Sequence, residues 1–323
     1  MLKLSKLHAP SIRLSGGSAD PFSTNLAEWI RPVKQDQEYD LCLMGVPLSK
    51  SSISFSGAHL HPQQFRKCWT SFTTYNWEQD IDLKPLRIAD LGDIEMHITD
   101  IAQCHQNIYE ANLSVQRAYP EAVSIAVGGD HSITAPLVKA IVEATGARIG
   151  IIQFDAHLDV RDLSYGGASN GTPMRNLIES NTIRGEDIVT IGLRNFANSR
   201  QYRDYAEQHG MNLVSQREVQ QAGIETIIAQ AMAILDQKCD QIYVTFDIDV
   251  LDQSVVPGVP AIGPQGLLPV ELFESAYILG KWEKVQAIDF VCVDPSVDFR
   301  DASTRVSLHI FLHFLSGFYR RKM

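Results

Sequence analysis

The chain has 323 residues, of which 45% are hydrophobic, and carries a formal net charge of -10. This length and hydrophobic content allow a large buried core, as in an enzyme of ordinary size. The acidic balance argues against nucleic acid or an anionic membrane surface as the main partner.

The first seventeen residues lack the uninterrupted apolar core of a secretory signal, and no segment approaches the roughly 18 to 20 apolar residues of a membrane span. We therefore expect a cytoplasmic protein without membrane contact. The five cysteines are Cys42, Cys68, Cys104, Cys239 and Cys292. Their odd number and the lack of CxxC pairs indicate reduced thiols rather than disulfides or a thiolate zinc site.

Short apolar segments predict eight strands, at 39–46, 87–91, 122–127, 149–154, 187–191, 212–214, 242–246 and 285–291. Helical patterns lie between several of them, for example at 135–144, 225–238 and 270–279.

Strands that alternate with helices predict an α/β fold, with three α/β/α layers around a central, mostly parallel sheet of about eight strands. No linker divides the chain. We expect residues 39–323 to form a single catalytic domain, and residues 1–38 to be an N-terminal extension that packs on it or leads into it.

Three acidic motifs follow predicted strands: GGDH at 128–131, DAHLD at 155–159 and DID at 247–249. The carboxyl ends of parallel strands meet at one edge of a sheet, so the three motifs should converge there. On an extended strand end, residues two apart point the same way. Alternate residues of DAHLD, and likewise of DID, should therefore face one place.

Six residues of these motifs are the candidate ligands, two imidazoles and four carboxylates: His131, Asp155, His157, Asp159, Asp247 and Asp249. Any one of them alone fits an ordinary role, such as a helix cap or a buried core histidine. Four carboxylates crowded together would repel one another unless cations neutralised them. The set suits two hard or borderline divalent ions rather than one structural zinc, and it indicates a metal-dependent hydrolase.

The segments GGDHS, DAHLD and FDIDVLDQSVVPG resemble the metal-binding signatures of the ureohydrolase family of arginases, agmatinases and formimidoylglutamases. GVP at 45–47, GAHLHPQQFR at 57–66 and DLGD at 90–93 also match this family. The resemblance implies an arginase-like fold, a homo-oligomer and two Mn²⁺ ions per subunit. The ligand types leave Zn²⁺, Fe²⁺ and Co²⁺ open.

The resemblance also distributes the ligands: His131 and Asp159 on one ion, His157 and Asp249 on the other, and Asp155 and Asp247 bridging both. A hydroxide between the metals would be the nucleophile, with Asp159 placed to orient it. We assign Asp159, Asp249 and Asn170 to catalysis.

Two departures from the family pattern bear on the substrate. Asn170 stands where agmatinases have a histidine, and its SNGTPMR segment resembles the SSGTP loop of formimidoylglutamases. Cys292 in VCVDP stands where guanidine-cleaving members have a glutamate that grips the cationic substrate. Cys292 is either a small packing residue or part of the substrate site, and Asp294 is a possible replacement acid.

We therefore expect cleavage of the C–N bond of a linear, acidic amidine, with N-formimidoyl-L-glutamate as the expected substrate, to L-glutamate and formamide in histidine degradation. The candidate substrate-binding residues are Arg161, Asn170, Arg175, Arg194 and Cys292, because arginine forks match carboxylates bidentately. Each arginine has a plain alternative as a surface or helix-end charge.

Two other functions stay open. The protein could be another ureohydrolase that acts on a guanidino acid, agmatine-like compound or guanidine, although Asn170 and Cys292 disfavour this. It could also be a catalytically weak family member that serves as a binding subunit, although all six candidate ligands are intact.

Overall fold

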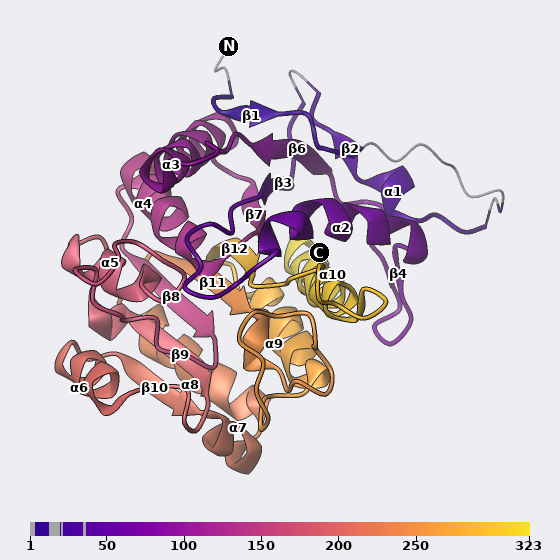
Figure 1. The fold of residues 1–323 in the computed structure, drawn as a ribbon. Helices are drawn as coiled ribbons and strands as arrows, with labels where there is room; N and C mark the ends of the chain where they lie inside the picture. Colours follow the sequence, from indigo (N-terminus) through magenta and orange to yellow (C-terminus); the bar gives the residue numbers. More distant parts are fainter. Residues whose placement is uncertain (1–3, 13–19, 21, 35–36) are drawn as a thin grey trace.

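The computed structural model describes residues 4–12, 20, 22–34 and 37–323. At its centre is a ten-stranded sheet (Figure 1). From one edge to the other the strands are β1 (Leu7–His8), β6 (Ile88–Ile94), β3 (Leu41–Val46), β7 (Val123–Gly128), β12 (Val285–Val291), β11 (Gln241–Asp247), β8 (Ile149–Phe154), β9 (Ile188–Leu193) and β10 (Asn212–Ser215), with β2 (Arg31–Pro32) also paired to β6. Within this sheet, and among the described residues, only the pairing of β1 with β6 is antiparallel.

All eight predicted strands are present in this sheet, so the mostly parallel α/β prediction is confirmed. The predicted number of strands was too small because β1 and β2 were not expected. A separate hairpin is formed by β4 (Tyr75–Asn76) and β5 (Ile81–Asp82). The division of the chain into residues 1–38 and 39–323 stays a prediction, although β1 and β2 pair directly with β6.

Helices cover both faces of the sheet (Figure 1). They are α1 (Leu26–Trp29), α2 (His61–Cys68), α3 (Ile101–Ala118), α4 (Thr134–Thr145), α5 (Pro173–Glu179), α6 (Arg200–Gln208), α7 (Gln216–Ala222), α8 (Ile224–Asp236), α9 (Pro269–Lys281) and α10 (Ala302–Lys322). The short 3₁₀ helices are η1 (Ala58–Leu60), η2 (Trp69–Ser71), η3 (His131–Ile133), η4 (Gly185–Asp187) and η5 (Ile248–Val250). The three predicted helices correspond to α4, α8 and α9.

Two hydrophobic cores separate the three layers. One contains side chains of α2, α8, α9 and α10, and the other contains side chains of α3, α4 and α6. Successive residues of β3 alternate between them, with Leu41 and Leu43 in the first core and Cys42 and Met44 in the second. A strand buried on both faces reads as a continuous apolar segment, which is why these strands were predictable.

A buried ion pair explains two of the family-like motifs. Arg66, from GAHLHPQQFR on α2, is 1% exposed. Its guanidinium donates to Asp90 Oδ1 at 2.8 Å and to Asp93 Oδ1 at 2.6 Å, both in the DLGD motif of β6. Removing one partner would leave a buried charge unpaired, so these motifs join α2 to the sheet.

Among the described residues, no helix is long and apolar enough to cross a membrane.

Candidate metal centre

The six candidate ligands lie at the carboxyl ends of three central strands, β7, β8 and β11. His131 begins η3 directly after β7, and DAHLD occupies the loop after β8. Asp247 is the last residue of β11, and Asp249 lies in η5. All six are buried except His157, which is partly exposed. The structure therefore brings the three motifs together at the carboxyl edge of the sheet, as predicted.

The prediction that these side chains share a direction because they lie on extended strand was wrong. β8 ends at Phe154, so DAHLD is not extended strand. The motif instead turns back on itself: Asp155 Oδ1 accepts a hydrogen bond from His157 N at 2.6 Å, and Asp159 has a φ of 53°. In the same way Asp247 Oδ1 accepts from Asp249 N at 2.9 Å. Aspartate side chains that bond their own backbone two residues on produce such turns.

The first cluster is centred on His131 Nδ1. This nitrogen lies 2.8 Å from Asp159 Oδ2, and 3.2 Å from one oxygen each of Asp155 and Asp247. Neither His131 Nδ1 nor Asp159 Oδ2 has a properly aligned hydrogen-bond partner among the described residues. An imidazole nitrogen with three carboxylate oxygens within 3.2 Å of it is a donor set that fits a divalent cation.

The second cluster is centred on His157 Nδ1, which lies 3.3 Å from Asp155 Oδ1 and 3.1 Å from Asp249 Oδ2. Asp155 thus turns one oxygen to each cluster, the arrangement of a bridging carboxylate. Asp247 lies in the first cluster only, with its other oxygen bonded to Asp249 N. The predicted bridging role of Asp247 stays a prediction.

The pKa values of the cluster reflect its crowding. Burial and the neighbouring Asp249 and Asp155 raise the pKa of Asp247 to about 8. Burial and Asp155 raise the pKa of Asp159 to about 6. The Asp249 carboxylate raises the pKa of His157 to about 12. Without cations the cluster holds protons at neutral pH, so metal uptake would release them.

Comparison with known proteins agrees with this geometry. Residues 39–316 match the model of the arginase family. The chain belongs to the arginase family.

This arginase-family protein is 47% identical to the formimidoylglutamase of Halalkalibacterium halodurans over 275 residues. The aligned part covers 85% of this chain and 86% of the relative. The crystal structure of formimidoylglutamase from Bacillus subtilis superposes with a TM-score of 0.90 and 37% identity, over 95% of this chain and 96% of that one. The crystal structure of Trypanosoma cruzi formiminoglutamase with two Mn²⁺ ions superposes with a TM-score of 0.84 and 26% identity, over 93% of this chain and 99% of that one. The predicted family and fold are thereby confirmed.

Several side chains that sequence reasoning missed hold the ligands of this arginase-family protein. Gln153 Nε2 donates to Asp155 Oδ2 at 2.7 Å, and Gln153 Oε1 accepts from Thr190 Oγ1 at 2.9 Å. Asn198 holds the DAHLD backbone, accepting from Leu158 N at 2.9 Å. The available signal was a polar residue inside an apolar strand, as Gln153 in IGIIQF.

Asn170 links two loops at the edge of the sheet. Its side-chain oxygen accepts from Ile53 N at 2.9 Å, and its backbone N donates to Ser51 O at 3.1 Å. The loop after β8 is thus tied to the loop after β3. The catalytic and substrate-binding roles assigned to Asn170 stay predictions.

Cys292 lies directly after β12, beside Asp247. It is 4% exposed and has a φ of 64°. In the metal-free protein burial raises the pKa of its thiol well above 9, and the Asp247 and Asp249 carboxylates act in the same direction, so the thiol is neutral there. Asp294 is buried and already bonded: its carboxylate accepts from Gly57 N at 2.6 Å and from Ser296 N at 2.9 Å.

The three candidate arginines have different surroundings. Arg194 is 9% exposed and donates to the carbonyl oxygens of Asp249, Ala261 and Gly263 at 3.0 to 3.3 Å. Arg175 donates to Asp162 at 2.9 Å and to Glu179 at 2.6 Å.

Arg161 is exposed and lies 5.7 Å from the centre of the Tyr202 ring. Among the described residues it has no carboxylate within ion-pair distance. Of the three arginines, Arg161 is therefore the one whose guanidinium is available to an anion.

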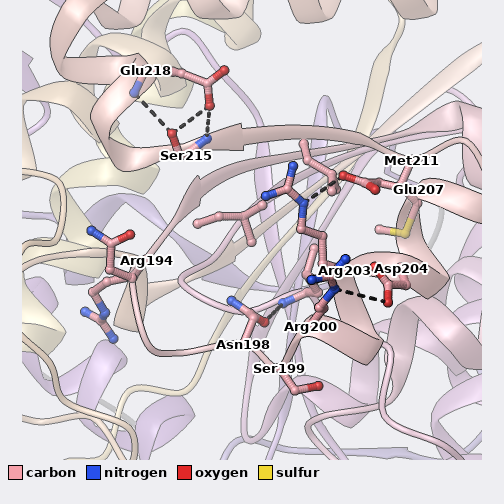
Figure 2. A pocket seen from close by; sticks show the side chains of 14 residues that line it. Arg194, Asn198, Ser199, Arg200, Arg203, Asp204, Glu207, Met211, Ser215 and Glu218 are labelled. Atoms are coloured by element: carbon pink, nitrogen blue, oxygen red, sulfur yellow. Dashed lines mark hydrogen bonds and ion pairs between the residues drawn. The ribbon is translucent and has the colours of Figure 1, made fainter.

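A cavity of about 950 Å³ lies beside the ligand loop and is lined by Leu158, Arg194 and residues of β9, α6, β10 and α7. Figure 2 shows Arg194 set apart from Arg200 and Arg203 in this cavity. Arg203 pairs with Glu207 at 2.7 Å on its own helix, so its charge is already matched.

Proposed function

We propose that this protein is a dinuclear Mn²⁺ hydrolase that cleaves N-formimidoyl-L-glutamate to L-glutamate and formamide. The observation that carries the proposal is the 47% identity to a formimidoylglutamase over 86% of that relative's length. The two ligand clusters joined by Asp155 supply a fitting metal site. The six ligands would be His131, Asp155, His157, Asp159, Asp247 and Asp249.

Two divalent cations, when bound there, lower the pKa of water and stabilise negative charge that develops on the amidine carbon's substituents. The chain itself sets the direction of each donor atom. Asp155 presents one oxygen to each cluster, and Asp159 presents Oδ2 beside His131.

The absence of a carboxylate at Cys292 favours an amidine over a guanidine. A carboxylate at that position could form a charged pair with guanidinium, whereas a thiol buried beside Asp247 cannot. Asp294 does not replace that carboxylate, because its oxygens already accept backbone hydrogen bonds.

The carboxylates of the substrate need cations near the metals. Arg161 fits this role because it follows the ligand loop by two residues and has no partner carboxylate among those the structure describes. Arg194 would act indirectly, by holding the Asp249 carbonyl. Homo-oligomerisation and a cytoplasmic location, both expected from the sequence, belong to this proposal as well.

The test is a product analysis. The purified, Mn²⁺-loaded protein is incubated with N-formimidoyl-L-glutamate, and the products are identified by NMR. We expect glutamate and formamide in equal amounts. Release of N-formylglutamate and ammonia, or no turnover at all, would contradict the proposal.

A further inference from the structure

A polar pair lies beneath the metal centre, inside the two central strands β11 and β12. Thr245 of β11 and Asp289 of β12 are paired across the sheet, and both are 0% exposed. Thr245 Oγ1 lies 2.9 Å from His131 Nε2, on the side of the imidazole opposite the candidate metal position. Buried polar groups inside strands are costly unless hydrogen bonded, so this pair needs an explanation.

Asp289 is held by further hydroxyl groups. Thr134 Oγ1 donates to Asp289 Oδ2 at 2.6 Å, and Tyr243 OH donates to the same oxygen at 2.7 Å. The other oxygen, Oδ1, is buried without a hydrogen-bond partner among the described residues, which leaves it open to a proton from its cross-strand neighbour Thr245. Burial raises the pKa of Asp289, while hydrogen bonds from Thr134, Thr245 and Tyr243 act against it.

The direction of the hydrogen bonds that link Asp289, Thr245 and His131 follows from which of these groups can donate a proton. Hydrogen bonds from Thr134 and Tyr243 favour the ionised form of Asp289, which only accepts hydrogen bonds, so in that form the Thr245 hydroxyl donates its proton toward Asp289. The Thr245 oxygen is then left to accept from His131 Nε2. A proton fixed on Nε2 leaves Nδ1 with a free lone pair that faces Asp155, Asp159 and Asp247.

We propose that Asp289 is a positioning residue that acts through Thr245 to hold His131 with its proton on Nε2 and its Nδ1 free for a metal ion. The inference rests on the proposed metal ligation by His131. Partners of this kind behind a metal-binding histidine fix its orientation and tautomer, and their loss typically weakens metal affinity about 10- to 100-fold.

Asp289→Asn tests the donor-to-acceptor direction of these hydrogen bonds, because asparagine has nearly the same shape as aspartate. The hydroxyls of Thr134 and Tyr243 both donate to the Oδ2 position, so the amide oxygen must sit there and the amide NH₂ must face Thr245. The Thr245 hydroxyl would then be driven to donate toward His131 Nε2. That arrangement puts the imidazole proton on Nδ1, where it competes with the metal.

The experiment titrates metal-free protein with Mn²⁺ and measures the affinity for each of two ions by electron paramagnetic resonance. We expect Asp289→Asn and Thr245→Val each to weaken one ion about 10- to 100-fold and to leave the other near the wild-type value. Thr245→Ser, which keeps the hydroxyl, should bind like the wild type. Thr134→Val is the matched control, because it removes a donor to Asp289 without reversing the hydrogen bonds between Asp289, Thr245 and His131.

A double-mutant cycle separates this role from a general structural one. If Asp289 acts through Thr245, the double variant should bind Mn²⁺ no more weakly than the weaker single variant. Additive losses, or wild-type affinity for both ions in folded single variants, would overturn the proposal. If Asp289→Asn does not fold, Thr245→Val against Thr245→Ser decides the same link.

Failure of the proposed function can be told apart from failure of this inference. A wild-type protein that binds no Mn²⁺ would contradict both the proposed function and the positioning role of Asp289. If the wild type binds two ions and cleaves formimidoylglutamate, but the single variants bind Mn²⁺ as tightly as the wild type, only the role of Asp289 is contradicted. Two ions with the expected pattern of variants, but no turnover of formimidoylglutamate, would leave the positioning role standing.

Discussion

At the scale of single residues, Asp155 is the most connected group of the candidate metal centre. Its two oxygens face different clusters, and Gln153 and His157 N hold them in place. Sequence reasoning identified this residue from its motif. It could not identify Gln153 as its support, because that contact depends on the side chain lying next to the strand end in the folded protein.

We predict that Asp155→Ala loses both metal ions, because it removes a ligand from each cluster. His157→Ala should lose one ion, because His157 belongs to the second cluster only. Metal content is measured by elemental analysis after dialysis against Mn²⁺ and desalting. Asp204→Ala, an exposed carboxylate on α6, is the control and should keep two ions. Two retained ions in Asp155→Ala would contradict the bridging assignment.

A second residue-scale prediction concerns the substrate carboxylates. Arg161→Met should raise KM for formimidoylglutamate roughly 10- to 100-fold, because a hydrogen bond between charged groups is worth about 1.5 to 3 kcal/mol. Metal content should not change. Arg175→Met is the matched control, since that guanidinium is already paired with Asp162 and Glu179. A normal KM in Arg161→Met together with a raised KM in Arg175→Met would reverse the assignment.

At the scale of elements, the sequence predicted strands better than the loops between them. Segments such as 149–154 and 285–291 coincide with β8 and β12 because strands buried on both faces leave a continuous apolar signal. The two-residue strands β1 and β2 leave no such signal. The turns that aim Asp159 and Cys292 depend on a positive φ, which side-chain type alone does not indicate.

The loops after β9 and β11 are joined by Arg194, and this link yields an element-scale prediction. Arg194→Met removes the donor from three carbonyl groups, one of them in Asp249. We expect the free energy of unfolding to fall by about 2 kcal/mol or more, with weaker Mn²⁺ binding. Chemical denaturation measures the first effect. Arg200→Met, an exposed change in the same cavity, should be close to neutral, and equal stability of the two variants would contradict this role.

At the scale of the whole molecule, the candidate metal centre joins three central strands, so its charge affects overall stability. In the metal-free protein the folded-state pKa values of Asp247, about 8, and His157, about 12, lie above their ordinary values of 3.8 and 6.5. A raised folded-state pKa contributes stability at low pH that is lost as the pH rises toward that value. Both groups therefore make the metal-free protein less stable at pH 8.5 than at pH 6.5.

We predict that EDTA lowers Tm, and that the Tm difference between Mn²⁺-loaded and metal-free protein is larger at pH 8.5 than at pH 6.5. Bound ions stabilise the folded state by mass action and replace the protons on the cluster. Thermal unfolding at both pH values, with and without Mn²⁺, measures the difference. A Tm that is independent of EDTA at pH 8.5 would contradict the metal centre.

The central claim, that the site selects a linear acidic amidine, is tested most directly by competition in one reaction. Formimidoylglutamate, guanidinobutyrate, agmatine and arginine are mixed at equal concentration with the Mn²⁺-loaded protein, and their consumption gives the ratios of kcat/KM. Because the thiol at Cys292 offers guanidinium no charged partner, we expect formimidoylglutamate to be preferred by at least about 100-fold, or roughly 2.7 kcal/mol. Equal or faster consumption of any guanidino compound, with release of urea, would contradict the account.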